Sequence, residues 1–204
     1  MFITFEGPNG VGKTAVVDAV AEKLSNLGFD VLRTKEPTKS PLGEFLRDAE
    51  EFYSGECLAC IAAADRYLHI EREIVPALSV SKIVLSDRYV ESSLVLQRMD
   101  GCTLDFIWEL HSRIPVPDLS VILVAEPAVL NQRLMAERKR LSRFERNESR
   151  EKEVRYYREA AEFISQRGFN VFLLANDVSS LEENANRVVQ EIQKLYDKGK
   201  EKKL

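Results

Sequence analysis

The chain has 204 residues, of which 45% are apolar, so it is long enough for one well-buried domain and short for two. Its net charge of −4 gives no indication of a protein that coats nucleic acid or an acidic membrane surface. The apolar runs are too short to span a bilayer, and the N-terminus lacks the basic start and the cleavage site of a signal peptide. We therefore expect one cytoplasmic domain over residues 1–204, with neither a nucleic-acid polymer nor a membrane as partner.

Short apolar runs alternate with longer amphipathic stretches along the chain. This alternation predicts an α/β fold of three layers, in which helices cover both faces of a five-stranded parallel sheet. The predicted strands are rich in Val, Ile, Leu or Phe without strict alternation, as in strands covered on both sides; they are residues 2–6, 29–34, 82–86, 119–125 and 169–175. The predicted helices are residues 13–27, 41–51, 57–79, 103–114, 127–136, 150–167 and 181–196. Residues from about 197 to 204 are expected to form a solvated, flexible tail.

The most specific motif follows the first predicted strand. Residues 7–14 match the phosphate-loop pattern G-x-x-x-x-G-K-[ST] at every fixed position, between a strand and a helix as the motif requires. Glycines let successive backbone N–H groups turn toward a polyphosphate, and the positive end of the following helix adds to the attraction. The motif predicts a P-loop NTPase fold whose ATP-binding residues are Gly7, Pro8, Asn9, Gly10, Val11, Gly12, Lys13 and Thr14. We expect Lys13 to reach the outer phosphates and the Thr14 hydroxyl to ligate Mg²⁺.

Two further candidate residues follow the third predicted strand. Asp87 and Arg88 come directly after it, and ligands of open parallel sheets bind beyond the carboxyl ends of the strands. An Asp there can hold Mg²⁺ through its water shell, and an Arg can clamp a phosphate with two parallel hydrogen bonds. Arg66 precedes this strand on a long apolar helix, where a surface ion pair is an equally good interpretation from these residues alone.

Residues 138–146 contain five Lys or Arg side chains in nine positions of an otherwise acidic chain. Charge runs usually form an exposed helix face, which is the alternative here. Because a phosphate-transfer site needs movable cations, we interpret the cluster as part of a short basic lid at about residues 137–150.

Two other functional classes have less support. A GTP-driven switch would carry N-K-x-D and D-x-x-G motifs, and neither occurs in the chain. Cys57 and Cys60 could form a redox or metal pair, but there is no second pair and there are two histidines only. With Cys102 they are expected to be free thiols.

The combined motifs resemble those of the thymidylate kinase family over most of the chain. Beyond the phosphate loop, the resemblance rests on E-P-T-K-S-P-L-G-E-F-L-R at 36–47, A-A-D-R-Y-L-H at 63–69, D-R-Y-V-E-S-S-L-V-L-Q at 87–97 and P-D-L at 117–119. Arg143 and Glu145 match the D-R-x-E of the family's lid, with Ser142 in place of the Asp. Each motif alone is weak, whereas their order and spacing together are specific.

This resemblance implies transfer of the ATP γ-phosphoryl group to dTMP, giving dTDP, with Mg²⁺ as cofactor. Lys13 would stabilise the transferring phosphoryl group and Arg88 would hold the acceptor phosphate. Family members carry an arginine in the phosphate loop or in the lid; the loop position is Gly10 here, which implies a lid arginine, Arg143 first and Arg138 second. The implied acceptor-binding residues are Asn9, Glu36, Pro37, Arg47, Ala62, Arg66, Arg88, Ser92 and Gln97, and the implied metal site is Thr14 with Asp87. The resemblance also implies a homodimer, with residues 61–74 and 104–114 as the candidate interface; alternatively these faces pack on the sheet.

Several acceptor positions depart from the family pattern. Asn9 stands where the family has an acidic residue, and Lys35 stands where it has Arg. Ala62 replaces the family's Phe that stacks on thymine, Leu96 replaces a Tyr, and Val124 replaces an Asp. A neighbouring aromatic such as Tyr67 or Phe45 could fill the space beside Ala62, or a wider pocket could accept a different (deoxy)nucleoside monophosphate or a nucleoside. We favour dTMP, because Arg66 and Gln97 persist. A non-catalytic ATP-binding regulator is the remaining alternative.

Overall fold

The computed structural model describes residues 1–137, 144 and 150–201. Its centre is a parallel sheet of β1 (Phe2–Glu6), β2 (Val31–Lys35), β3 (Ile83–Asp87), β4 (Leu119–Val124) and β5 (Val171–Ala175). The strand order is β2-β3-β1-β4-β5, so that β1 lies at the centre with Ile3 opposite Leu85 on one side and Leu119 on the other. All five predicted strands are confirmed: β1 has the predicted ends, and the ends of the other strands differ by at most two residues.

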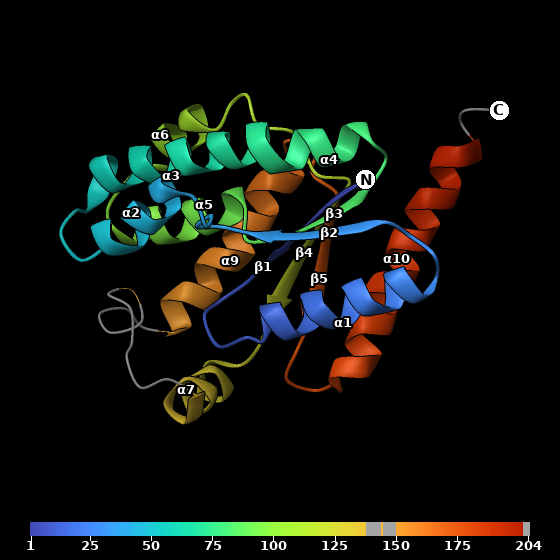
Figure 1. Cartoon of the computed structure of the whole chain (residues 1–204). Helices are drawn as coiled ribbons and strands as arrows, with labels where there is room; N and C mark the ends of the chain where they lie inside the picture. The colour runs from blue at the N-terminus through green and yellow to red at the C-terminus, as the bar shows by residue number, and fades with distance from the viewer. Residues whose placement is uncertain (138–143, 145–149, 202–204) are drawn as a thin grey trace.

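Helices cover both faces of the sheet (Figure 1). Helices α1 (Lys13–Asn26) and α10 (Leu181–Glu201) pack together on one face. The other face is covered by α3 (Gly55–His69), α5 (Val90–Met99) and α9 (Arg150–Ser165). Three further helices lie outside these: α2 (Pro41–Ala49) contacts α3, α6 (Leu104–Leu110) contacts α5, and α7 (Pro127–Glu137) contacts α9. The predicted three-layer α/β fold is confirmed.

The double cover explains the uninterrupted apolar strands. Side chains of a strand point alternately to its two faces. Ile3 and Phe5 therefore pack with Val20 in the cluster under α1 and α10, while Phe2 packs with Leu94 under α5. Both faces of β1 are fully buried, so neither selects for polar residues.

The predicted helix 57–79 is divided into three stretches. Helix α3 is followed by a π-helical turn η1 (Ile70–Ile74) and by α4 (Val75–Ser79). Pro76 stands in the first turn of α4. Proline lacks an N–H and its ring crowds the preceding turn. The helix therefore adopts the wider π-helical turn just before Pro76.

Helix α5 was not among the predicted helices. Its polar residues Glu91, Ser92, Ser93 and Gln97 break an apolar periodicity, yet all four are buried. A helix enclosed on every side has no solvent face and so no amphipathic signal. Helix α10 continues to Glu201, into the segment for which we expect a flexible tail. Among the helices described, none is both long and apolar enough to cross a membrane.

Candidate active site

The phosphate loop joins β1 to α1, as the motif requires. Gly7 has a φ of 140° and lies so close to β4 that a Cβ would approach the Leu123 carbonyl oxygen to 2.3 Å. Only glycine fits there. The Val11 carbonyl accepts hydrogen bonds from Asn176 Nδ2 (2.6 Å) and Arg133 Nη1 (3.4 Å). Sequence reasoning missed Asn176 and Arg133, because their segments meet the loop only through the fold.

Lys13 begins α1 and is folded back over the loop. Its Nζ donates hydrogen bonds to the carbonyls of Gly7 (2.7 Å) and Pro8 (3.0 Å). Burial, assisted by the nearby charge of Arg88, lowers the pKa of Lys13 to about 7. A bound triphosphate would supply the negative charge that this buried amine needs to remain protonated.

Thr14 and Asp87 meet at the edge of the loop. Thr14 Oγ1 donates a hydrogen bond to Asp87 Oδ2 over 2.7 Å, which brings the two predicted metal ligands together. Mg²⁺ is usually held by one or two protein oxygens, waters and substrate phosphates, so this oxygen pair fits a metal that arrives with the nucleotide. In the part of the chain that the structure describes, no cluster of three or more His, Cys, Asp or Glu residues could hold a metal by itself.

The backbone at Arg88 adopts a conformation that is rare for a non-glycine residue, with φ at 85°. Glu6 fixes the turn that follows: its Oε1 accepts from the backbone N–H of Tyr89 (2.5 Å) and of Ser92 (3.1 Å). Such backbone strain persists only where surrounding contacts hold it, and it gathers at functional sites. Glu6, which sequence reasoning missed, is this support.

The Arg88 guanidinium is aimed at the phosphate loop. It donates to Asn9 Oδ1 (2.5 Å) and to Ser92 Oγ (3.0 Å). The Asn9 backbone N–H in turn donates to Glu153 Oε1 on α9 over 3.1 Å. Arg88 therefore lies beside the triphosphate site, at the position where a second phosphate could be clamped.

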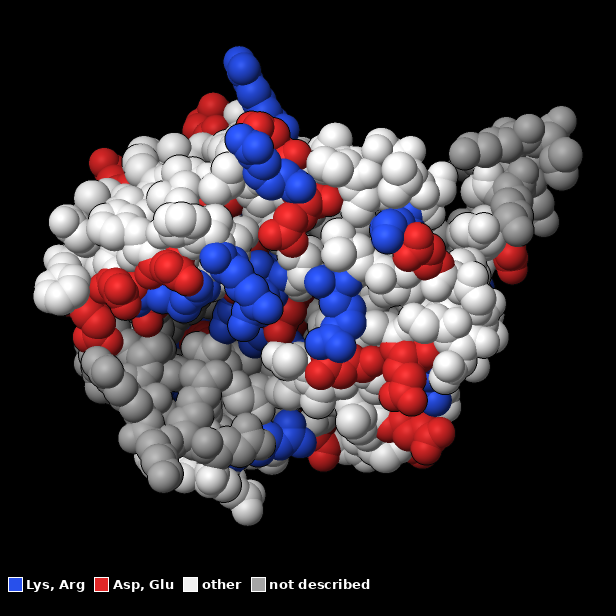
Figure 2. Space-filling view, viewed as in Figure 1, with Lys and Arg blue, Asp and Glu red and all other residues white. Residues whose placement is uncertain are grey.

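A single cavity of about 570 Å³ connects the phosphate loop with the ends of β2 and β3 and with α2, α3 and α5. All the predicted acceptor residues lie on its wall: Asn9, Glu36, Pro37, Arg47, Ala62, Arg66, Arg88, Ser92 and Gln97. Gly10, Gly12, Lys13, Thr14 and Asp87 also line it, whereas Gly7, Pro8 and Val11 are buried behind the loop surface. Figure 2 shows Lys and Arg side chains gathered beside a hollow, between the end of β2 and the start of α1.

Arg66 is a saturated hydrogen-bond donor. Its Nε and Nη2 both contact Glu36 Oε2, at 2.9 and 2.7 Å. Its Nη1 contacts Ser93 Oγ (2.9 Å) and His111 Nε2 (2.5 Å), and Nη2 also donates to the Tyr89 carbonyl (2.7 Å). His111 accepts because burial and the Arg66 charge lower its pKa to about 3 and keep it neutral. All five N–H groups of Arg66 are thus engaged, so a base carbonyl would have to displace one of these partners.

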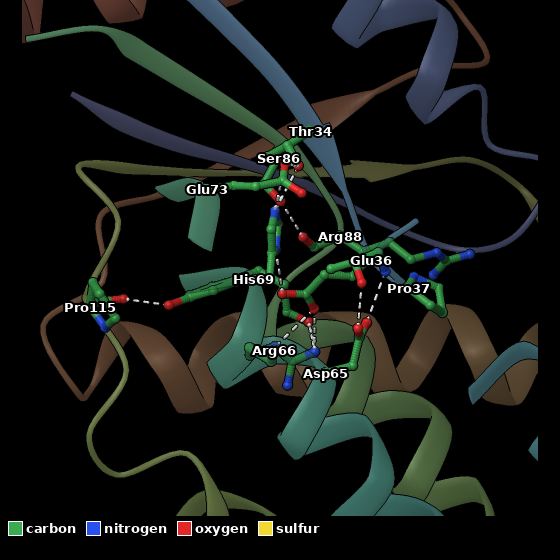
Figure 3. Close-up of polar contacts among 12 residues, drawn as sticks. Thr34, Glu36, Pro37, Asp65, Arg66, His69, Glu73, Ser86, Arg88 and Pro115 are labelled. Carbon is green, nitrogen blue, oxygen red and sulfur yellow. Dashed lines mark hydrogen bonds and ion pairs between the residues drawn. The ribbon is translucent and has the colours of Figure 1, made fainter. Parts of the chain in front are cut away.

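A chain of polar contacts continues from Glu36 away from the cavity (Figure 3). Glu36 Oε1 contacts His69 Nδ1 at 3.1 Å, and His69 Nε2 contacts Thr34 Oγ1 at 2.7 Å. Thr34 Oγ1 also donates to Glu73 Oε2 at 2.6 Å. In Figure 3 the Arg88 side chain extends away from this chain of contacts. His69 therefore acts on the site through Glu36, by holding the cavity wall in place.

The loop after Glu36 is fastened from two sides. Asp65 accepts from the Thr38 backbone N–H (2.9 Å) and hydroxyl (2.6 Å), and Arg47 Nη1 donates to the carbonyls of Pro37 (3.0 Å) and Thr38 (2.9 Å). A Cβ on Gly43 would lie 2.2 Å from the Thr38 carbonyl oxygen. The close approach of this loop to α2 explains why the segment 36–47 contains a glycine inside a helix.

The far end of the cavity is apolar. Ala62 and Leu58 of α3, Leu46 of α2 and Leu96 of α5 line it together with Phe144. The aromatic ring beside Ala62 is thus Phe144, and neither of the two aromatics named from the sequence lines the cavity. Tyr67 belongs to the cluster under α5, and Phe45 is 48% exposed and pairs with Tyr53.

Two polar groups remain available at the border of this apolar end. The Gln97 amide makes no hydrogen bond among the described residues and lines the cavity. The Ser93 oxygen accepts from Arg66, and its own O–H has no acceptor in the described part of the chain. Ser93 was missed from the sequence, since the helix that turns it inward was missed.

Other predicted features lie elsewhere. Arg138 and Arg143 lie outside the described residues, as does most of the expected lid. Cys57 and Cys60 are free and exposed on α3, and Cys102 is free and buried, as expected for unpaired thiols.

The fold and the site together define a P-loop phosphotransferase, in which the phosphate loop and Arg88 border one cavity. A sequence model of thymidylate kinase matches residues 5–197. The probable thymidylate kinase of Pyrococcus horikoshii is 35% identical over 197 residues, covering 92% of this chain and 93% of that protein. That of Thermococcus kodakarensis is 32% identical over 207 residues (96% and 98%), and the thymidylate kinase of Finegoldia magna is 44% identical over 102 residues (48% and 50%). The chain belongs to the thymidylate kinase family, as its motifs predicted.

Proposed function

We propose that this protein transfers the γ-phosphoryl group of ATP to dTMP. An oxygen of the dTMP phosphate attacks the γ-phosphorus, the bond to the β,γ-bridging oxygen breaks, and ADP leaves with that electron pair. The supporting observation is that Lys13 and Arg88 face one cavity, from the triphosphate loop and from the acceptor side respectively. The acceptor phosphate is already ionised, so the reaction requires positioning and charge stabilisation and no strong general base.

The residues around the cavity have distinct roles in the proposed reaction. Lys13 neutralises charge on the transferring phosphoryl group, and Arg88, oriented by Asn9 and Ser92, holds the acceptor phosphate in line. Glu36 and Arg66 hold the wall against which the acceptor's sugar and base lie. The apolar end of the cavity takes the base.

Magnesium is the proposed cofactor, held by Thr14 and Asp87 together with the nucleotide phosphates. When bound, it neutralises charge on the β- and γ-phosphate oxygens. Its support here is the pair of oxygens 2.7 Å apart at the edge of the phosphate loop.

After Lys13 and Arg88, a lid arginine is the proposed third cation of the site. The phosphate loop has no arginine, because Gly10 stands at the position where some family members carry it. Arg143 is the first choice and Arg138 the second. Arg143→Ala should lower kcat and leave dTMP affinity nearly intact, with Arg138→Ala as the comparison. If neither variant lowers kcat, the lid assignment is wrong.

A homodimer in the cytoplasm is the proposed state of the protein. Helix α3 presents exposed Ala64 and half-buried Ile61, Tyr67 and Leu68 toward the surface, which offers an apolar strip for a second copy. Light scattering after gel filtration would decide between one and two copies.

The acceptor identity is tested by a substrate screen. Purified protein with Mg-ATP is offered every deoxy- and ribonucleoside monophosphate and thymidine, and dTMP should give the highest kcat/KM. A different acceptor preferred tenfold or more would replace dTMP. Tight ATP binding without acceptor-dependent turnover would instead favour a regulatory ATP-binding protein.

A further inference from the structure

We propose that Phe144 supplies the aromatic surface against which the acceptor base lies, in place of the side chain missing at Ala62. This inference rests on the proposed function, because it assigns the base-contacting residue of the same cavity. It names a specificity residue that the sequence motifs place in the lid, far along the chain from the helices that form the cavity wall.

Phe144 is packed beside Ala62, the position at which the family pattern has the ring that stacks on the base. It is 6% exposed and belongs to one cluster with Leu46, Ala49, Leu58 and Ala62. It lines the cavity as well, so its ring is shared between this cluster and the open space. Alanine at position 62 and a ring at position 144 are complementary, because well-packed interiors leave no room for a second ring beside the first.

The backbone of Phe144 is tied to the triphosphate site. Its carbonyl accepts from Arg150 Nη2 at 3.5 Å, and Arg150 Nη1 contacts Glu153 Oε2 at 2.5 Å. Glu153 Oε1 accepts the backbone N–H of Asn9 in the phosphate loop. This chain of contacts fixes the position of Phe144 relative to the phosphate loop.

The chemistry of this end suits a flat, weakly polar base. Its wall is made of Leu46, Leu58, Leu96 and Phe144, and the Ser93 hydroxyl and the Gln97 amide line the same cavity. Aromatic rings stack on every base, while hydrogen bonds to the base edge select among them. A pyrimidine nucleotide, held by its ring against Phe144 and by its edge at Ser93 and Gln97, matches this arrangement.

The test moves the aromatic ring from position 144 to position 62 and measures the dissociation constant of dTMP directly. Phe144→Ala should weaken dTMP binding about 5- to 150-fold, the loss of one base–aromatic stack. Ala62→Phe alone should also weaken it, because two rings compete for one space. The double variant Ala62→Phe/Phe144→Ala should bind more tightly than either single variant. Phe45→Ala, which removes an aromatic residue outside the cavity, is the matched control and should bind like the wild type.

An abasic ligand separates stacking from a structural effect. The inhibition constant of 2-deoxyribose 5-phosphate should be unchanged in Phe144→Ala, since this ligand has a phosphate and no base. An equal loss for dTMP and for the abasic ligand would overturn the proposal, and so would unchanged or tighter dTMP binding by Phe144→Ala.

Failure of the proposed function gives a different result. If the wild type binds another monophosphate in preference to dTMP, the same variants are measured with that ligand. If the effects of the two single substitutions are then additive and the double variant shows no recovery of binding, the base-contacting role of Phe144 is wrong, whichever nucleotide is the acceptor.

Discussion

Asn9 Oδ1 and Arg88 Nη2 lie 2.5 Å apart, although 79 residues separate them in the chain. Asn9 belongs to the phosphate loop after β1 and Arg88 directly follows the neighbouring strand β3, so the parallel pairing of these strands creates the contact. In the reaction we propose, this hydrogen bond orients the arginine toward the acceptor phosphate.

Replacing Arg88 should therefore affect the acceptor more than ATP. In Arg88→Lys, a single ammonium cannot reproduce the planar fork that contacts Asn9 and Ser92, and kcat/KM for dTMP should fall about 10- to 100-fold. The KM for ATP should change little. Steady-state kinetics with each substrate varied in turn measures both; an equal rise in the two KM values would assign Arg88 to ATP instead.

Lys13 should take up a proton when ATP binds. Burial and Arg88 lower its pKa to about 7 in the empty site, and the triphosphate should raise that pKa. The ammonium contribution to affinity is then complete below pH 7 and is lost as pH rises through the pKa of the complex. Calorimetry of ATP binding near pH 8, in buffers of different ionisation enthalpy, should detect the uptake, since the phosphate itself, with a second pKa of about 6, is ionised there.

The control for this measurement is Lys13→Met, which should abolish proton uptake. Lys13→Ala should lower kcat at least about 10²-fold, as for other fixed charges that stabilise a transition state. A change confined to the KM for ATP would mean that Lys13 binds ground state and transition state equally.

Asp87→Asn should raise the Mg²⁺ concentration required for half-maximal activity. The amide keeps the size of the side chain and can still accept the Thr14 hydrogen bond, but it removes the charge that favours the metal. Titration with Mg²⁺ at saturating ATP checks this. Ser79→Ala, at an exposed hydroxyl far along the chain from the loop, should leave the titration unchanged.

Gly43→Ala should destabilise the fold by about 1–3 kcal/mol, as overpacking does. Alanine normally stabilises a helix interior, but here its Cβ would lie 2.2 Å from the Thr38 carbonyl oxygen. Thermal unfolding should show a Tm lower by about 2–4 °C for each kcal/mol. Gly199→Ala, in α10 with open space around the position, should leave Tm unchanged or slightly raised.

Glu36→Gln should reduce stability at neutral pH and less so in acid. Burial alone would raise the pKa of Glu36, but Arg66 and His69 hold it below its ordinary value of 4.5. A depressed pKa means that the ionised Glu36 stabilises the fold fully above pH 4.5 and loses this contribution as pH falls through the folded-state pKa. The difference in Tm between variant and wild type should narrow as pH falls below about 4.5; a constant difference would show that charge is not the cause.

Local patterns in the sequence determined the phosphate loop, the five strands and most helices, because each depends on residues close together in the chain. The same patterns placed Asp87 and Arg88 at a strand end, where parallel sheets bind their ligands. Family resemblance then named acceptor residues such as Gln97 and Glu36, all of which line one cavity.

Only the tertiary structure decided which partners these residues contact and which of their polar groups face the cavity. Every N–H group of Arg66 donates to a partner from another segment of the chain. Ser93 lines the cavity because α5, a helix without an amphipathic pattern, is buried along most of its length. Phe144 lies beside Ala62 across a wide gap in sequence, a contact that no local periodicity encodes. Such assignments depend on burial and on which partners the fold brings within hydrogen-bonding distance, and a linear sequence states neither.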